Sequence, residues 1–454
     1  MSIVGDTISS LLVKEEEYKL NDVIIDGIPF WPLFKYDIRR KYIIENGIVE
    51  KLVSAKNKLN IFESPLGILQ SFWQFHKILL HPHPVDNLFM GFSRLDKVHG
   101  LYMDKFIDPI VEEADLHHNY IYFEYGRVGK HKKPRLNPEH ICYTDYIYLL
   151  STLWSLIASP VYMLMHYHDL VAFQNKIEAT FNLKTSLLYL SRKTTEFKML
   201  CSTYSYILAR LKVKRVFGVS RIVFIHAAFA AKKRGLMVFE LQHGITLGPT
   251  DLYAGIYHPE IDPDMFLTFG KSCPLNVFGV PENRIKNIGW AFNKYIQRIS
   301  HQAEGNAFLV VSEPQITNEI IEAVTMMAKT FPDKEFHIRR HPTETFTESQ
   351  KETIKCYNNI KDTTSEENSF VVLMSYKYVL GENCSVLYEA MSLGKKVARL
   401  SFCGLRPTLR SQDDGFFYLD SPSDLQKIIE SQNKPLNQEV YSEFSKSNFM
   451  SLLN

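Results

Sequence analysis

The C-terminal third of the chain alternates short apolar runs with stretches of helical spacing. An apolar run at residues 306–311 and a second strand expected at 335–339 enclose a segment, 320–331, whose apolar side chains recur every three or four positions. A helix near 347–356 and a strand near 370–374 are expected to follow. Continuous apolar runs are typical of parallel strands covered on both faces, so the pattern predicts right-handed βαβ units in a doubly wound sheet.

Residues 376–397 carry the most informative local pattern. A buried strand is expected first, then a polar turn, a helix whose first turn holds Asn383 and Ser385, a stop at Gly394 and another strand. A helix N-terminus that faces the end of a parallel strand suits a phosphate, because it presents free N–H groups and a positive dipole end. The segment therefore predicts a nucleotide site, with simple capping by Asn383 or Ser385 as the alternative.

The N-terminal part repeats this rhythm less regularly. Strands are expected at residues 87–92, 119–123, 215–219 and 237–241. An alanine-rich helix over 221–234 ends in basic residues before a glycine. The pattern predicts a second Rossmann-like unit, preceded by an irregular arm over residues 1–80.

At 454 residues the chain exceeds what one hydrophobic core usually supports. Periodicity lapses in a polar stretch at 300–305, which marks the expected boundary. We expect an N-terminal lobe over 1–302, a nucleotide-binding Rossmann-like lobe over 303–425, and a helical tail over 426–454 that packs back on the first lobe.

Composition narrows the classes of partner. A formal net charge of +2, with 45% apolar and 22% charged residues, is ordinary for a globular protein and gives no reason to expect a nucleic-acid partner. The six cysteines form no C-x-x-C or Cys/His pair at metal-ligand spacing, which indicates reduced thiols and no metal site. The first residues lack the basic start and apolar core of a secretory signal, so a cytoplasmic location is expected.

Residues 146–165 form an uncharged run long enough to cross a bilayer. The run contains serines and a proline, and its flanks show no strong Lys/Arg asymmetry. Three interpretations stay open: a transmembrane span, a contact with the membrane surface, and a buried or acceptor-facing helix. Trp154 and the basic residues between 130 and 135 are compatible with a peripheral contact at the inner membrane.

The first cluster with chemical potential follows the strand expected at 237–241. Gln242, His243 and Gly244 come next, and Thr246 lies in the loop beyond them. An imidazole can take or hold a proton near neutral pH, and the glycine lets the backbone approach a substrate closely. A structural histidine with a satisfied partner is the alternative.

A second cluster closes the strand expected at 335–339. Arg339, Arg340 and His341 emerge together there and can neutralise a phosphate, whereas a solvated basic strand end is the alternative. Glu389, one turn into the helix of the 376–397 segment, can accept both hydroxyls of a ribose whose phosphate lies at the helix N-terminus. Its alternative is an ordinary exposed helix residue.

The order of these motifs is more specific than any one of them. QHG at 242–244, the stretch 277–289, RRHP at 339–342 and S-x-x-x-E-A-x-x-x-G-K from Ser385 together resemble bacterial surface-polysaccharide glycosyltransferases of the GT-B fold. The resemblance covers residues 215–400. It is greatest to capsule and lipopolysaccharide enzymes such as Kdo transferases and polysialyltransferases, and the CDP-glycerol glycerophosphotransferases of teichoic-acid synthesis are similar at the same places.

The resemblance implies an α/β protein with two Rossmann-like lobes facing across a cleft. It implies transfer of a sugar from a nucleotide-sugar donor to a capsule or lipopolysaccharide glycan, free or lipid-linked, with no cofactor. A CDP-polyol phosphotransferase, a non-hydrolysing sugar-nucleotide epimerase and a non-enzymatic scaffold are the alternatives.

The resemblance also implies roles for individual residues. The donor phosphate would meet Arg339, Arg340, His341, Asn383 and Ser385, the ribose would meet Glu389, and the acceptor side of the cleft would hold Gln242, Gly244 and Thr246. The acidic pair that sialyl-type enzymes use as a base is missing, so His243 is the preferred base, with Glu124, Asp108 and Asp251 as rivals. No D-x-D motif lies in a suitable loop, which fits a metal-independent reaction.

Overall fold

The chain folds as two compact units in the computed structural model. Unit 1 comprises Met1–Leu95, Asp104–Thr268 and Cys273–Asn287, and unit 2 comprises Asp96–Met103, Phe269–Ser272 and Ile288–Asn454. The structure describes residues 3–48, 63–91, 95–125, 130–244, 249–271, 279–299, 305–341, 344–365, 367–407, 415–432 and 440–453.

Unit 1 is built on a seven-stranded sheet in which every pair of neighbours is parallel. Its strands are β3 (Asn87–Met90), β6 (Tyr120–Glu124), β7 (Ile141–Tyr143), β8 (Arg215–Val219), β9 (Met237–Leu241), β10 (Met265–Thr268) and β11 (Ile285–Asn287). The spatial order is β7-β6-β3-β8-β9-β10-β11. Counted along the chain this is 3-2-1-4-5-6, the order of a dinucleotide-binding Rossmann sheet, with one strand added.

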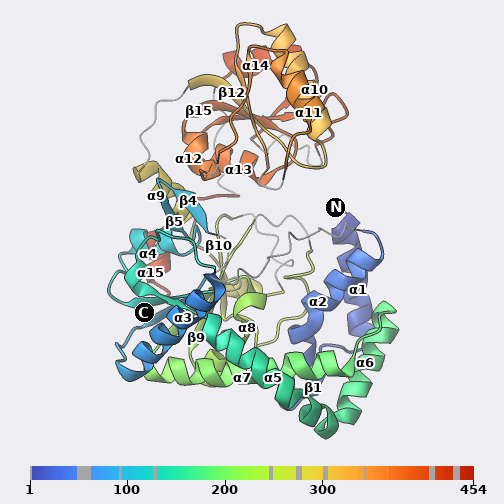
Figure 1. Ribbon diagram of the computed structural model, residues 1–454. Helices are drawn as coiled ribbons and strands as arrows, with labels where there is room; N and C mark the ends of the chain where they lie inside the picture. The colour runs from blue at the N-terminus through green and yellow to red at the C-terminus, as the bar shows by residue number, and fades with distance from the viewer. Residues whose placement is uncertain are drawn as a thin grey trace. The chain divides into compact units, whose positions relative to one another are not determined.

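Helices cover the sheet of unit 1 because its strands are apolar on both faces. One face packs against α3 (Glu63–Leu80), α5 (Asp145–Met165), α7 (Leu187–Arg210) and α8 (Arg221–Lys233) in a single hydrophobic core (Figure 1). On the sheet itself, Phe217 stacks between Phe89 and Phe239, with ring centroids 4.9 and 4.7 Å away. The short helix α4 (Asp108–Ala114) precedes β6 in the chain.

The described residues of the N-terminal arm, 3–48 and 63–80, are largely helical, so the expectation of an irregular arm over residues 1–80 is wrong for them. Its elements are α1 (Ile3–Glu17), the hairpin of β1 (Ile24–Ile25) and β2 (Ile28–Pro29), α2 (Phe30–Glu45) and α3. Phe30, Trp31 and Phe34 are fully buried in a second core that they share with α6 (Tyr167–Phe181). Their helical spacing is plain in the sequence, but the partner that orders them lies more than 130 residues away in the chain.

Unit 2 has a six-stranded parallel sheet with the same strand order. The strands are β12 (Gly305–Val311), β13 (Phe336–Arg339), β14 (Ile360–Asp362), β15 (Tyr376–Gly381), β16 (Lys396–Leu400) and β17 (Phe417–Leu419). They lie in the order β14-β13-β12-β15-β16-β17, again 3-2-1-4-5-6. The predicted fold class, α/β with two Rossmann-like lobes, is confirmed by these two sheets.

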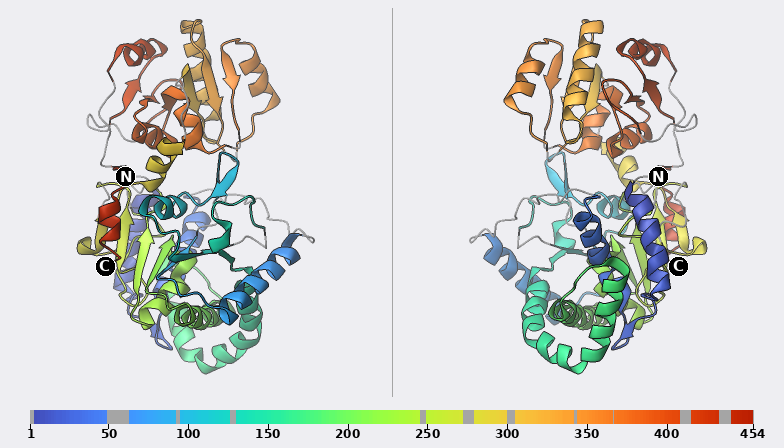
Figure 2. Two further views of the ribbon diagram at one scale, coloured as in Figure 1. Left: turned by 90° about the vertical axis from the view of Figure 1, so that its left-hand side faces the viewer. Right: turned by 90° about the vertical axis from the view of Figure 1, so that its right-hand side faces the viewer.

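The helices of unit 2 lie on both faces of its sheet (Figure 2). One side carries α10 (Thr317–Thr330), α11 (Glu348–Lys355) and α14 (Leu425–Glu430), and the other carries α12 (Ser369–Met374) and α13 (Ser385–Ser392). The unit also contains α9 (Ala291–Ile299) and α15 (Lys446–Met450). Short 3-10 turns lie at Pro138–His140 in unit 1, at Glu282–Arg284 in unit 1 and at Pro422–Asp424 in unit 2.

The strand expected at residues 370–374 is instead the helix α12. Asn368 begins it by accepting a hydrogen bond from the backbone N–H of Phe370 at 2.8 Å. A run of five apolar residues fits either a strand or one buried helical turn, and here the capping residue decides.

A hairpin from early in the sequence belongs to unit 2. It consists of β4 (Asp96–Val98) and β5 (Leu101–Met103). The backbone N–H of His99 donates to Glu367 Oε1 at 3.2 Å, and the N–H of Asn368 donates to the carbonyl of Lys97 at 3.0 Å. The expected boundary at residue 302 and the packing of the tail on the first lobe stay predictions.

Truncation of Phe34 tests whether the arm is part of the core. Its ring is fully buried and lies 5.1 Å from the ring of Phe30 and 5.8 Å from that of Phe173. We expect Phe34→Ala to lower the free energy of unfolding by about 3–5 kcal/mol in urea denaturation. Val13→Ala, at a 67% exposed position of α1, is the control and should change it by less than about 0.5 kcal/mol. Equal effects of the two changes would show that the arm does not pack as described.

Candidate functional site

Each sheet has one point at which its strand order reverses. In unit 1 this point lies between β3 and β8, and in unit 2 between β12 and β15. Open parallel sheets bind ligands outside the carboxyl ends of the strands at such a point. The predicted residues divide between the units: Glu124, Gln242, His243, Gly244 and Asp251 belong to unit 1, and Arg339, Arg340, His341, Asn383, Ser385 and Glu389 to unit 2.

Glu124 ends β6 and is held on both carboxylate oxygens. Oε1 lies 2.8 Å from Nδ1 of His131, and Oε2 accepts from Nε of Arg135 at 2.9 Å. The other ring nitrogen of His131 lies 2.7 Å from Asp145 Oδ2. Burial lowers the pKa of His131, but its bonds to Asp145 and Glu124 outweigh this and raise the pKa above its usual value. A buried imidazolium between two carboxylates fits this arrangement.

The network continues to two further carboxyl groups. Arg135 Nη1 donates to Asp108 Oδ2 at 3.1 Å, and the same oxygen accepts from the backbone N–H of Asp104 at 2.7 Å. Tyr122 donates its hydroxyl to Asp104 Oδ2 at 2.9 Å. Burial, reinforced by the nearby Asp108, raises the pKa of Asp104 to about 7. Asp104 can therefore exchange a proton near neutral pH, a property that its sequence context did not signal.

The QHG segment lies where β9 ends. Gln242 is buried and its side-chain amide donates to the carbonyl of Gly244 at 2.9 Å. His243 is half-buried, and its ring centroid lies 6.1 Å from that of Phe106. The backbone N–H of Phe106 donates to Asp104 at 2.8 Å, so Phe106 lies near both the imidazole and the carboxyl group with the raised pKa. Thr246 lies outside the described residues.

Asp251 is tied to the N-terminal helix α2. Its carboxylate lies 3.5 Å from Arg40 Nη1, and its carbonyl accepts from Arg39 Nη1 at 3.3 Å. Arg39 is fully buried, and two of its guanidinium nitrogens donate to the carboxylate of Glu15, at 2.7 and 2.6 Å. The arm thus positions the loop after β9, because one guanidinium binds α1 and that loop together.

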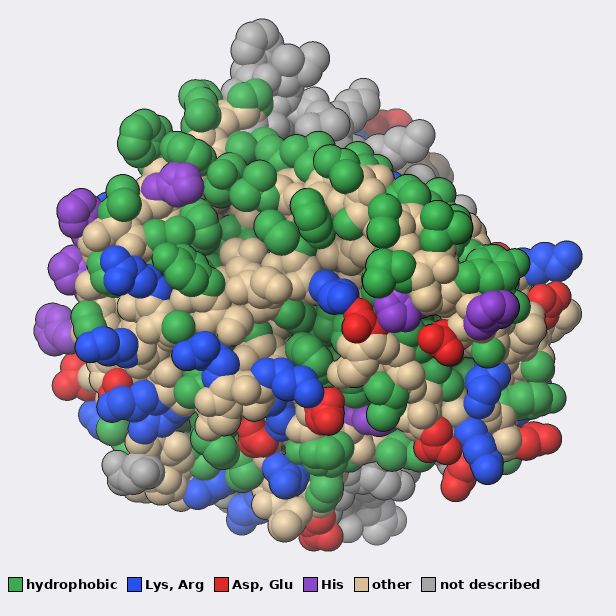
Figure 3. All heavy atoms as spheres, turned by 90° about the horizontal axis from the view of Figure 1, so that it is seen from below, with side chains coloured by type: hydrophobic (Ala, Val, Ile, Leu, Met, Phe, Trp, Pro, Cys, Tyr) green, Lys and Arg blue, Asp and Glu red, His purple; other side chains and the backbone are tan. Residues whose placement is uncertain are grey.

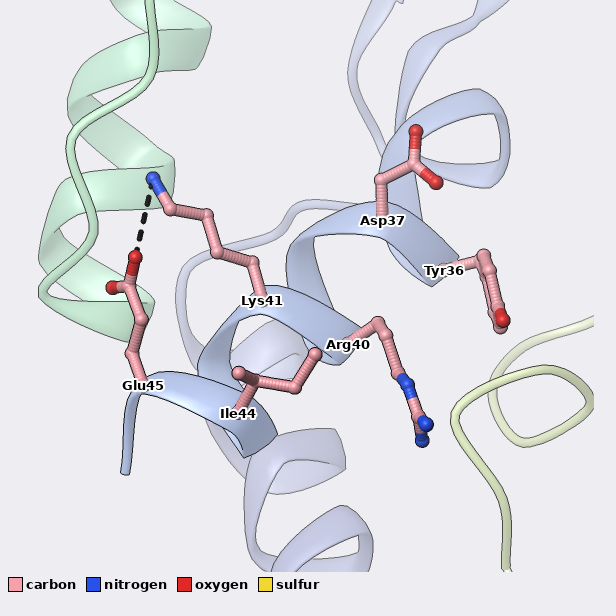
Figure 4. Close-up of a pocket in the computed structure, with 6 residues that line it drawn as sticks. All are labelled: Tyr36, Asp37, Arg40, Lys41, Ile44 and Glu45. Atoms are coloured by element: carbon pink, nitrogen blue, oxygen red, sulfur yellow. Dashed lines mark ion pairs between the residues drawn. The ribbon is translucent and has the colours of Figure 1, made fainter. Parts of the chain in front are cut away.

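A shallow pocket lies beside this contact on α2 (Figure 4). It is lined by Tyr36, Asp37, Arg40, Lys41, Ile44 and Glu45. Its charges are paired: Lys41 lies 3.8 Å from Glu45, Asp37 accepts from Tyr189 at 2.9 Å, and Arg40 meets Asp251. A pocket whose charges are matched within the chain offers little to a charged ligand.

Lys35, which lies one turn before Arg39 on α2, was not identified from the sequence. Its side chain is 5% exposed, near Asp262, Arg221 and Glu15. Burial lowers its pKa to about 8, and the attraction of Asp262 offsets only part of that effect. Its position in an apolar stretch of α2, between Phe34 and Tyr36, was the only sequence signal.

In unit 2 the two arginines at the end of β13 already have polar partners within the chain. Arg339 donates to Ser365 Oγ at 3.2 Å and to the carbonyl of Glu367. Arg340 Nε lies 3.1 Å from Asp362 Oδ2, at the end of β14. Burial lowers the pKa of Arg339, although nearby acids that include Glu389 oppose the shift. The alternative of a purely solvated basic strand end therefore does not describe Arg339.

His341 is exposed at the same edge and its loop is held by a buried carboxylate. Glu344 Oε2 accepts from the backbone N–H of His341 at 2.9 Å, while Oε1 accepts from Ser312 at 2.7 Å and Thr317 at 2.6 Å. Glu344 thereby joins the end of β12, the start of α10 and the His341 loop. Pro342 lies outside the described residues.

Neither Asn383 nor Ser385 caps α13. Cys384 is the N-cap residue and makes no side-chain capping bond, and the exposed Ser385 is the first residue of the helix. Asn383 instead accepts from Arg399 Nη1 at 3.0 Å, and its backbone N–H donates to Glu313 Oε1 at 3.3 Å. Burial raises the pKa of Glu313, so this carboxyl loses its charge more readily than usual.

Glu389 is buried, at 6% exposure, so the alternative of an exposed helix residue is wrong. Its Oε2 accepts from Ser369 Oγ at 2.9 Å, which joins α13 to α12. The structure brings Glu389 close enough to Arg339 for their charges to interact. A buried carboxylate beside a cation, one turn from a helix N-terminus, is suited to hydroxyl groups.

The comparisons with known proteins extend to fold alone. No family model and no curated protein matches the chain. A solved UDP-GlcNAc 2-epimerase from Neisseria meningitidis, bound to UDP-GlcNAc, is 12% identical with a TM-score of 0.48, over 82% of this chain and 99% of that one. One from Methanocaldococcus jannaschii is 11% identical at 0.47, over 81% and 98%. The lipopolysaccharide outer core galactosyltransferase WaaB is 13% identical at 0.40, over 80% and 93%.

Replacement of Lys35 tests its buried charge through the pH dependence of stability. Because the folded-state pKa of about 8 lies below the ordinary 10.5, the charged lysine weakens folding below pH 8, and this cost fades as pH rises towards 10.5. We expect Lys35→Met to raise the free energy of unfolding at pH 7 by up to about 3 kcal/mol, with the gain shrinking by pH 10. Urea denaturation at both pH values measures it. Lys41→Met, at an exposed position of the same helix, should show neither effect. A gain that is equal at pH 7 and pH 10 would contradict the assignment.

Proposed function

We propose that this protein is a glycosyltransferase that moves a sugar from a nucleotide-sugar donor to a glycan, free or lipid-linked, of a bacterial capsule or lipopolysaccharide. It acts in the cytoplasm. Unit 2 binds the nucleotide, and unit 1 supplies the proton chemistry at the acceptor hydroxyl.

One observation carries the proposal. The reversal of strand order in unit 2 lies next to the start of α13, and the buried Glu389 follows one turn later, where it accepts from Ser369. A phosphate at that helix end would meet backbone N–H groups, the exposed Ser385 and the loop of His341. A ribose bound one turn further would reach Glu389.

The proton chemistry is assigned to His243. It is half-buried at the carboxyl end of β9 and lies near Phe106, whose backbone N–H binds Asp104, a carboxyl group with a pKa of about 7. Glu124 is saturated by His131 and Arg135, so we assign it to positioning the site, although it was a rival base. Asp251 is assigned to holding the loop after β9 against α2.

In the proposed reaction an acceptor hydroxyl loses its proton to His243 and attacks the anomeric carbon. The bond between that carbon and the nucleotide phosphate breaks, and the leaving phosphate takes the electron pair. The helix N-terminus and the cations of unit 2 stabilise its charge, with no step assigned to a metal. A polyol phosphotransferase would instead direct the acceptor to phosphorus, and an epimerase would need no acceptor.

Nucleotide binding tests the role of unit 2. Thermal shift with UDP, CDP and CMP should show stabilisation by one of them that saturates with concentration. We expect Glu389→Gln to weaken that nucleotide by about tenfold or more, because a hydrogen bond to a charged group contributes about 1.5–3 kcal/mol. Glu348→Gln, on the exposed start of α11, is the matched control and should bind like the wild type. Unchanged affinity in Glu389→Gln would reject the ribose assignment.

Turnover tests the role of unit 1. With the donor whose nucleotide binds, His243→Ala should lower kcat by about 10²–10⁴-fold while the thermal shift by the nucleotide is unchanged. His118→Ala, an exposed histidine just before β6, should retain full activity. Release of product by His243→Ala at the wild-type rate would move the base elsewhere, and conversion of the donor without any acceptor would favour the epimerase.

A further inference from the structure

Helix α5 has its polar and apolar faces reversed for a water-facing helix. Ser151, Ser155 and Ser159, spaced four residues apart, are 0–2% exposed and turn inward. The inward side lies against α7, where Thr152 donates to Glu196 at 3.1 Å. The outward side chains are 39–74% exposed: Leu149, Leu153, Trp154, Leu156, Ile157, Val161, Leu164 and Met165. Helices on a water-facing surface normally bury such residues and expose serine.

Helix α3 also exposes a row of apolar side chains, although its buried Phe75 packs in the core. Its inward side carries Ser71, which donates to the carbonyl of Tyr143 at 2.6 Å and accepts from the N–H of Tyr146 at 3.0 Å. Its outward apolar side chains, 55–71% exposed, are Leu66, Leu69, Trp73 and Leu80. Ser71 therefore joins α3 to the first turn of α5. Figure 3 shows hydrophobic side chains gathered over much of this side of unit 1.

The charges around the two stripes indicate what covers them. Residues 66–80 and 146–165 contain no Asp or Glu, and Lys77 is their one charged side chain. Two more cations border α3: Lys133 donates to the side chain of Gln70 at 3.1 Å, and Arg210 donates to the carbonyl of Leu79 at 2.9 Å. Carboxylates occur in the two helices only at their first residues, Glu63 of α3 and the buried Asp145 of α5. An apolar face with cations along its α3 border complements an anionic lipid surface.

The tryptophans point to the same occupant. Trp73 and Trp154 are 70% and 50% exposed on this face, whereas Trp31 and Trp290, the other two in the chain, are buried. Exposed tryptophan is typical of the boundary between lipid headgroups and acyl chains. α5 is the one helix among the described residues that is long and apolar enough to span a bilayer. Its serine face is packed on α7, however, which favours a helix lying in the plane of the interface.

We propose that α3 and α5 form a lipid-docking face with which the protein lies on an anionic membrane. The outward side chains of both helices enter the headgroup region, while Lys77, Lys133 and Arg210 meet anionic headgroups. This inference is independent of the proposed reaction, because it concerns neither the nucleotide nor the acceptor. It corresponds to the second of the three sequence interpretations of 146–165, the contact with the membrane surface.

Vesicle flotation tests the proposal with the full-length protein and no nucleotide. Vesicles of phosphatidylcholine mixed equally with phosphatidylglycerol should carry the protein up the gradient, and pure phosphatidylcholine should carry much less. We expect Ile157→Glu to reduce the bound fraction by about tenfold or more, because burial of one such side chain contributes about 1.5–3 kcal/mol. Met326→Glu, an exposed apolar position in unit 2, should float like the wild type.

A second measurement can begin with the wild-type protein alone. Brominated lipids in the same vesicles should quench the tryptophan fluorescence of the wild type, and Trp154→Phe should lose much of that quenching. Absence of flotation and quenching would overturn the proposal, as would a dimer in buffer that Ile157→Glu converts to monomers without any vesicle binding. Resistance to extraction by alkaline carbonate would overturn the surface geometry in favour of a span. Catalytic failure of His243→Ala would leave all of these results unchanged.

Discussion

Parallel strand pairing in the order 3-2-1-4-5-6 is the constraint on which the rest of both units depends. Every ladder in the two large sheets is parallel, so each chain return needs a crossover, and the crossovers supply the helices that cover both faces. The same pairing brings the carboxyl ends of all strands to one edge. Polar side chains that follow different strands, such as Glu124 and His243, are thereby placed at one edge of a sheet although they are far apart in the chain.

At those edges the charged side chains are held mainly by hydrogen bonds and ion pairs with one another. In unit 1, His131 joins Glu124 to Asp145 and Arg135 joins the same Glu124 to Asp108, while in unit 2 the carboxylate of Glu344 accepts from three donors in three segments. Such closed networks hold loops in one geometry before a ligand arrives. Of the predicted site residues, His341 and Ser385 are exposed and His243 is half-buried.

The N-terminal arm has a structural role that links it to the site. Arg39 binds Glu15 on α1 and the carbonyls of Asp251 and Ala254 in the loop after β9. The arm also shares its aromatic core with α6, the helix that follows α5 in the chain. One side of unit 1 therefore supports the candidate active edge, while α3 and α5 present an apolar surface to the outside.

The sequence by itself determined strands β3, β6, β8 and β9 of unit 1 and β12, β13, β15 and β16 of unit 2, together with the helix after Gly381 that carries Glu389 one turn inside it. The local sequence pattern predicts these elements because apolar residues recur with different periods in strands and helices. It did not indicate strands β7, β10, β11, β14 and β17. Tertiary structure alone decided the helical arm, the helix α12, the buried charge of Lys35, the raised pKa of Asp104 and which face of α5 is outward. Each depends on partners remote in the chain, since burial, charge pairing and exposure are set by packing and not by neighbouring residues.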